Sequence, residues 1–139
     1  MDWGVLTFVF AIITVGILIF VAILLTGKRH HRFNIEDYQA RFLAIENSLQ
    51  KNHPTSFSIS ILEADKLLDR AMHEIGFPGK TMGERLKKSN NRFSNLNAIW
   101  RAHKLRNYIA HEPNFSVSFT QAQNALTIYK QALKDLGAI

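Results

Sequence analysis

Residues 96–113, which read LNAIWRAHKLRNYIAHEP, decide the fold of this chain. At about 100° per residue, their apolar side chains fall on one broad arc, as expected for a helix that packs against a core. Arg106, His103 and Asn107 fall inside that arc, and His111 lies at its edge. Because an arginine is rarely buried without a partner, polar side chains among core positions indicate a structural or chemical purpose.

Within this stretch, Arg106, Asn107 and His111 form an RNxxxH pattern that is followed by Glu-Pro. The pattern resembles the RxxxxH signature of the HEPN superfamily, and the resemblance extends loosely from about residue 34 to the C-terminus. It implies a small all-helical domain, which in many prokaryotic toxin and defence systems is a metal-independent endoribonuclease. Other members are non-catalytic modules that bind RNA or nucleotides. The resemblance also implies that two domains pair, here as a homodimer, so that two motifs line one cleft.

RNA cleavage without a metal needs a base, an acid and a cation near the phosphorus. A histidine such as His111 titrates near neutrality and can transfer either proton. The Arg106 guanidinium matches phosphate oxygens and would stabilise the charge that develops on them. Asn107 could bond the imidazole or the ribose, and His103 is a second histidine candidate. Alternatively, Arg106 pairs within the fold, and His111 bonds a carbonyl at the helix end; the expected partners of Arg106 are then Asp69, Glu63 or Glu112.

On a straight helix, Arg106 and His111 point about 140° apart. They converge only if the last turn deviates or a second subunit contributes. Asp69, near the buried edge of an earlier helix, could face Arg106 or a histidine and orient it. The other interpretation is a solvated acid paired with Lys66 or Arg70.

The overall composition narrows the classes of function. The 139 residues allow one modest domain plus an appendage, and the absence of cysteine excludes disulfides and thiolate sites. The formal net charge is +6, and residues 80–106 hold eight basic side chains and one acid, Glu84. This charge suits RNA or an anionic membrane, although it could also simply be a solubilising surface. The residues expected to bind RNA are Lys87, Lys88, Arg92, Arg101 and Lys104.

Residues 3–25 carry no charge and, as a helix, span roughly 35 Å, enough to cross a bilayer. A cleaved signal peptide fits badly, because the run is too long and no basic segment precedes it. Lys28, Arg29 and Arg32 follow it, so the positive-inside rule places the N-terminus outside and the domain in the cytoplasm. These cations are also expected to contact anionic lipid headgroups. We therefore expect an anchor and basic segment over residues 1–33 of a single-pass cell-membrane protein.

The remaining residues, 34–139, are expected to form a HEPN-like bundle of four or five helices. Helical spacing and capping signals predict helices over residues 35–51, 56–75, 82–88 and 96–110, and a last one that ends near residue 136. No metal-ligand, phosphate-loop or dinucleotide motif occurs, so neither a metal nor another cofactor is expected.

Three functions remain open on the sequence. The first is a membrane-tethered, metal-independent endoribonuclease that uses Arg106 and His111. The second is a non-catalytic module that binds RNA, a nucleotide or an unknown partner protein, or that only dimerises. The third is a structural helical bundle.

Overall fold

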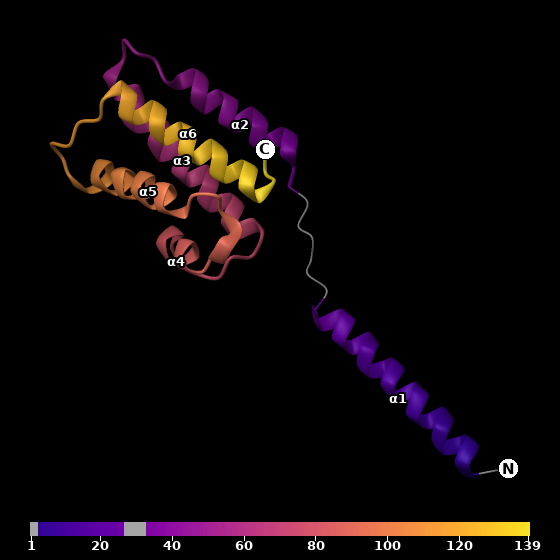
Figure 1. The fold of residues 1–139 in the computed structure, drawn as a ribbon. Coiled ribbons are helices and arrows are strands. Elements are labelled where there is room, and N and C mark those ends of the chain that lie inside the picture. Colours follow the sequence, from indigo (N-terminus) through magenta and orange to yellow (C-terminus); the bar gives the residue numbers. More distant parts are fainter. Residues whose placement is uncertain (1–2, 27–32) are drawn as a thin grey trace. The chain divides into compact units, whose positions relative to one another are not determined.

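The computed structural model describes residues 3–26 and 33–139, and this part of the chain is all-helical, with no strand. It divides into two compact units, residues 1–30 and 31–139, each of which is described by itself. The elements, shown in Figure 1, are α1 (Trp3–Thr26), α2 (Ile35–Ser48), α3 (Pro54–Glu74), α4 (Met82–Lys87), a short 3₁₀ helix (Asn90–Arg92), α5 (Leu96–His111) and α6 (Phe119–Leu136).

Helix α1 forms the first unit and is long and apolar enough to cross a membrane. Two of its polar side chains are paired within the helix, because the hydroxyls of Thr7 and Thr14 donate to carbonyls of the preceding turn. Such internal pairing is what a helix in lipid requires. The expected headgroup contacts of Lys28, Arg29 and Arg32 lie outside the described residues.

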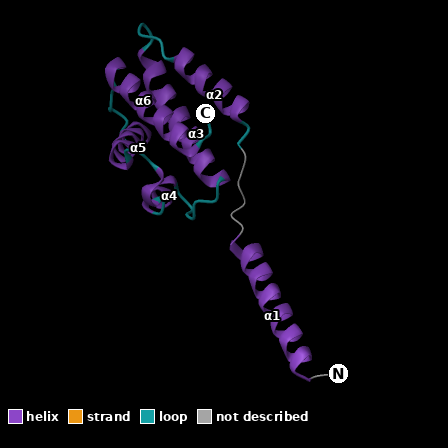
Figure 2. Ribbon diagram, turned by 45° about the vertical axis from the view of Figure 1, so that its right-hand side comes forward, coloured by secondary structure: helices purple, strands orange, loops and turns teal. Residues whose placement is uncertain are grey.

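Helix α3 is the centre of the second unit, where it packs against α2, α4, α5 and α6. Both views show α2, α3 and α6 running side by side, with α5 beside them (Figures 1 and 2). The largest fully buried apolar side chains of this core are Tyr38, Tyr129, Phe42, Ile61, Leu68, Met72, Leu86, Ile99 and Leu133. The five α-helices that follow α1 agree with the expected number.

Several helix ends follow the signals in the sequence, although α2 ends at Ser48, three residues before its predicted end. The side chains of Asn34, Thr81 and Ser118 each accept a backbone N–H three residues on. Gly137 ends α6 with φ of 76°, a left-handed conformation that glycine adopts without a steric penalty. Helix α3 begins at Pro54, two residues earlier than predicted, because proline is well tolerated in the first turn of a helix.

The helix that carries the motif, α5, matches its predicted position and continues through His111. Its buried residues are Ala98, Ile99 and Ala102, and these place one face of α5 against the core. Glu112 follows in an extended conformation, as expected for a residue before proline. The fold thus presents the motif on one regular helix with a fixed inner face.

Candidate functional site

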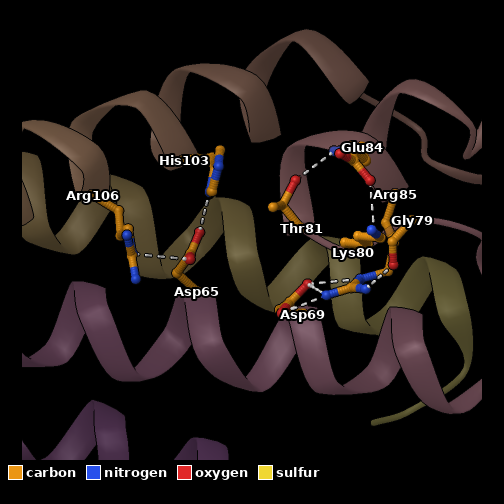
Figure 3. A network of polar contacts seen from close by, with 9 residues as sticks. All are labelled: Asp65, Asp69, Gly79, Lys80, Thr81, Glu84, Arg85, His103 and Arg106. Carbon is orange, nitrogen blue, oxygen red and sulfur yellow. Dashed lines mark hydrogen bonds and ion pairs between the residues drawn. The ribbon is translucent and has the colours of Figure 1, made fainter.

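Two polar side chains of α5 converge on Asp65, a buried residue of α3 that is only 4% exposed. His103 Nδ1 lies 2.8 Å from Asp65 Oδ1, and Arg106 Nε lies 3.3 Å from Oδ2 (Figure 3). From α6, the Tyr129 hydroxyl donates to Oδ1 at 3.0 Å. This carboxylate therefore links three helices. It is hydrogen-bonded to His103 and Tyr129 and ion-paired with Arg106, whose buried Nε makes no hydrogen bond within the described part of the chain.

Neither interpretation of Asp69 is confirmed. It does not orient Arg106 or a histidine, and its partner is neither Lys66 nor Arg70. Asp69 accepts hydrogen bonds from Arg85 Nε at 2.9 Å and from its Nη2 at 2.7 and 2.8 Å (Figure 3). Arg85 Nη1 also donates to the carbonyl of Gly79 at 2.6 Å. This ion pair fixes α4 on α3, and it was missed because Arg85 is one of several cations in a basic segment.

The helical positions of the two acids explain the error. At about 100° per residue, Asp65 lies about 60° from the core residue Leu68, whereas Asp69 lies about 100° from it. Asp65 is thus closer to the centre of the buried face. Its position on the helix could have identified it from the sequence, but no signal in the sequence indicated Tyr129 as its third partner.

A groove of about 790 Å³ lies beside this network, bounded by residues of α3, α4 and α5. Its lining includes His103, Arg106, Asn107, Trp100 and Lys87, but not His111. The Arg106 side chain is 34% exposed, so the guanidinium is held on one edge and accessible on another. Arg106 Nη1 donates to Asn107 Oδ1 at 3.1 Å.

Arg106 and His111 do not converge within one chain, because α5 remains helical from the first to the second. A regular helix separates them by about 140° and about 7.5 Å of rise. His111 is exposed, and its side chain makes no hydrogen bond or ion pair among the residues that the structure describes. His111 therefore does not cap the C-terminus of α5. The backbone N–H of Glu112 instead donates to the carbonyl of Tyr108 in the last turn.

His103, Asn107 and His111 lie four residues apart along α5 and so form one ridge of its surface. A carboxylate only accepts, so His103 Nδ1 carries the hydrogen shared with Asp65, which leaves Nε2 as the free ring nitrogen. Burial and the neighbouring Asp65 raise the pKa of Tyr129, which keeps its hydroxyl protonated as a donor. The ridge therefore has the oriented imidazole of His103 at one end and the unpartnered imidazole of His111 at the other.

The five cations expected to bind RNA are all exposed. Of the five, Lys87 lines the groove, whereas Lys88, Arg101 and Lys104 do not. Arg92 is exposed and lies over the Phe77 ring, 6.0 Å from its centroid.

The groove itself has a mixed electrostatic character. Its lining holds four acids, Glu63, Asp65, Asp69 and Glu84, and three cations, Lys66, Lys87 and Arg106. Two of these acids are paired with arginines, one of which is Arg85 outside the lining. Among the described residues, no three histidine or acidic side chains are grouped to hold a metal ion.

Comparisons with family models, with curated proteins and with solved structures find no match for this chain. The likeness to the HEPN superfamily therefore rests on Arg106, Asn107 and His111 in their order along α5.

Proposed function

We propose that this protein is a membrane-anchored, HEPN-like endoribonuclease that acts as a homodimer without a metal. The observation that carries the proposal is the contrast between the two motif residues on one regular helix. Arg106 is oriented by a buried carboxylate, and His111 is exposed with no partner among the described residues. Two copies would bring the Arg106 of one chain near the His111 of the other.

The role of Arg106 in this proposal is to bind and stabilise the phosphate. Asp65 contacts its Nε, and Asn107 accepts from Nη1. The remaining N–H groups are available to phosphate oxygens, for which the planar guanidinium is well matched. Because the side chain is already oriented, little reorganisation would be needed as charge develops in the transition state.

The role of His111 is proton transfer, and its exposure makes it accessible to a substrate. Cleavage needs a base at the 2′-hydroxyl and an acid at the leaving 5′-oxygen. His103 and His111 of one chain are about 12 Å apart along α5, too far to serve two oxygens of one phosphorus. A second copy related by a two-fold axis would supply the second proton-transfer group. Anchors in one membrane would keep the two copies together.

A non-catalytic RNA-binding module is the second candidate. It is favoured by the ion pair of Arg106 with Asp65, which partly neutralises the cation that catalysis would use. In that case, the exposed α5 residues would hold RNA without cleaving it.

RNA cleavage by the purified full chain in neutral detergent, with EDTA present, tests the proposal. We expect cleavage by the wild type and its loss in both Arg106→Ala and His111→Ala. Matched controls are Arg41→Ala and His73→Ala, which remove an exposed arginine and an exposed histidine elsewhere. RNA binding without cleavage in folded wild type would favour the second candidate. Absence of cleavage, together with clear destabilisation by both motif variants, would assign these residues to the fold.

A further inference from the structure

We infer that Tyr108 and Phe115 form a stacking platform for an unpaired RNA base beside His111. The inference rests on the proposed function and deepens it by naming single-stranded RNA as the substrate. Tyr108 is on α5, and Phe115 follows the turn at Pro113.

The exposure of these two rings is the first observation. Tyr108 is 42% exposed and Phe115 is 37% exposed. Within residues 33–139, which the structure describes, the other phenylalanine, tyrosine and tryptophan side chains are buried or half-buried. The two exposed rings are also in contact, with centroids 5.5 Å apart and planes inclined by 31°. A paired aromatic surface open to solvent is suited to stacking against another planar ring.

The second observation is the position of the platform relative to the motif. Tyr108 lies three residues before His111, so the two side chains are neighbours on the helix surface. Lys104 lies four residues before Tyr108, and its Nζ is 5.9 Å from the Tyr108 ring centroid. A base stacked on the platform would therefore carry its phosphate within reach of a lysine and the motif histidine. The flexible Lys104 stem allows the ammonium to move from the ring to that phosphate.

The charge of this surface suits RNA as the occupant. At about 100° per residue, the face of α5 that carries Tyr108 also carries Arg101 and Lys104, and the exposed Glu112 directly after α5 is the acid nearest to the platform. The two cations would attract a polyanion. The bases of a duplex are stacked and paired, so the platform selects an unpaired strand.

The test uses the full chain in neutral detergent and an RNA oligonucleotide that contains 2-aminopurine, in single-stranded and duplex form. Binding is measured by anisotropy, and stacking by quenching of the 2-aminopurine emission. We expect Tyr108→Ala to weaken single-strand binding by about 5- to 100-fold and to abolish quenching. Tyr108→Phe should retain both signals, and duplex RNA should show no quenching.

Two further variants keep the test decisive. Tyr108→Leu retains apolar volume without an aromatic face, so it should lose binding like the alanine variant while circular dichroism stays native. Leu43→Ala removes an exposed apolar side chain from α2 and should change nothing. The inference would be overturned if Tyr108→Leu bound RNA and quenched 2-aminopurine like the wild type. It would also be overturned if duplex RNA gave the same quenching as single-stranded RNA, or if the wild type bound no RNA.

The outcome is separable from that of the proposed function. Quenching that depends on Tyr108 but is accompanied by no cleavage would contradict the nuclease and leave the platform in place. Cleavage that is unaffected by Tyr108→Leu would contradict the platform alone.

Discussion

Asp65 is the residue on which the candidate site depends. It is buried and faces a histidine, an arginine and a tyrosine from two other helices. A buried carboxylate is tolerated when donors surround it, and its removal leaves those donors without their partner. The same contacts that stabilise the bundle therefore orient Arg106 and His103.

Replacement of Asp65 by alanine should lower the free energy of unfolding by about 3 kcal/mol, because a mostly buried ion pair loses one member. The measurement is urea unfolding of the full chain in neutral detergent, followed by circular dichroism. The matched control is Glu63→Ala, an exposed acid of the same helix, which should change stability by less than about 0.5 kcal/mol. Equal effects of the two variants would show that Asp65 has no special structural role.

Sequence reasoning located the residues of the motif but not all of their contacts. Arg106 and His103 were placed among core positions by helical period alone, and both are held at the buried edge of α5. Their acid was assigned one turn too far along α3, because sequence spacing does not show how two helices are rotated against each other. The third partner, Tyr129, is 64 residues away from Asp65 in the chain, and no local pattern encodes that contact.

At the scale of helices, hydrogen bonds join the residue before the N-cap of α5 to the last turn of α6. Asp135 Oδ2 accepts from the backbone N–H and the hydroxyl of Ser94, each at 2.7 Å, just before the N-cap Asn95. Gln131 donates to Oδ1 at 2.8 Å. Partial burial acts to raise the pKa of Asp135, but these hydrogen bonds prevail and lower it.

The lowered pKa gives a pH dependence of stability. The pKa of an aspartate carboxyl in the unfolded chain is about 3.9. When folding lowers this pKa, the ionised carboxylate stabilises the folded protein, and the effect is complete above the unfolded-state pKa. This contribution is lost as the pH falls through the folded-state pKa. Asp135→Asn should therefore lower stability by about 1 kcal/mol at pH 7, and the difference from wild type should shrink below about pH 4.

Unfolding at several pH values would check this prediction, with Glu36→Gln as an exposed control acid. A difference between Asp135→Asn and wild type that stays constant from pH 7 to pH 3 would contradict it.

Three N-caps were predicted correctly from the sequence. Asn34, Thr81 and Ser118 act as N-caps through contacts three residues on, and such local contacts can be read from spacing. The attachment of α4 could not be predicted in this way. It depends on the pairing of Arg85 with Asp69 across 16 residues, in a segment where any of several cations could have been the partner.

At the scale of the whole molecule, the chain combines an apolar helix with a basic helical unit. Helix α1 is long and apolar enough to span a bilayer. We propose that the cations after it hold residues 34–139 on the cytoplasmic side, because cytoplasmic loops retain excess Lys and Arg. This orientation would place the proposed site where cellular RNA is found.

The absence of cysteine makes the orientation easy to test, because one introduced thiol is a unique label. Ser116→Cys places it in the exposed segment between α5 and α6. A membrane-impermeant maleimide should label this variant only after the cells are permeabilised. Labelling of intact cells would contradict the proposed orientation, and a cysteine added before residue 3 should label in the opposite way.

The most direct test of the shared site is complementation between two inactive variants. Arg106→Ala and His111→Ala, carrying different tags, are expressed together, and the mixed dimer is isolated through both tags. If each site takes Arg106 from one copy and His111 from the other, one of the two sites is intact, and cleavage in EDTA should return to about half of the wild-type rate. A folded mixed dimer as inactive as either variant alone, beside an active wild type, would contradict a site shared between two copies.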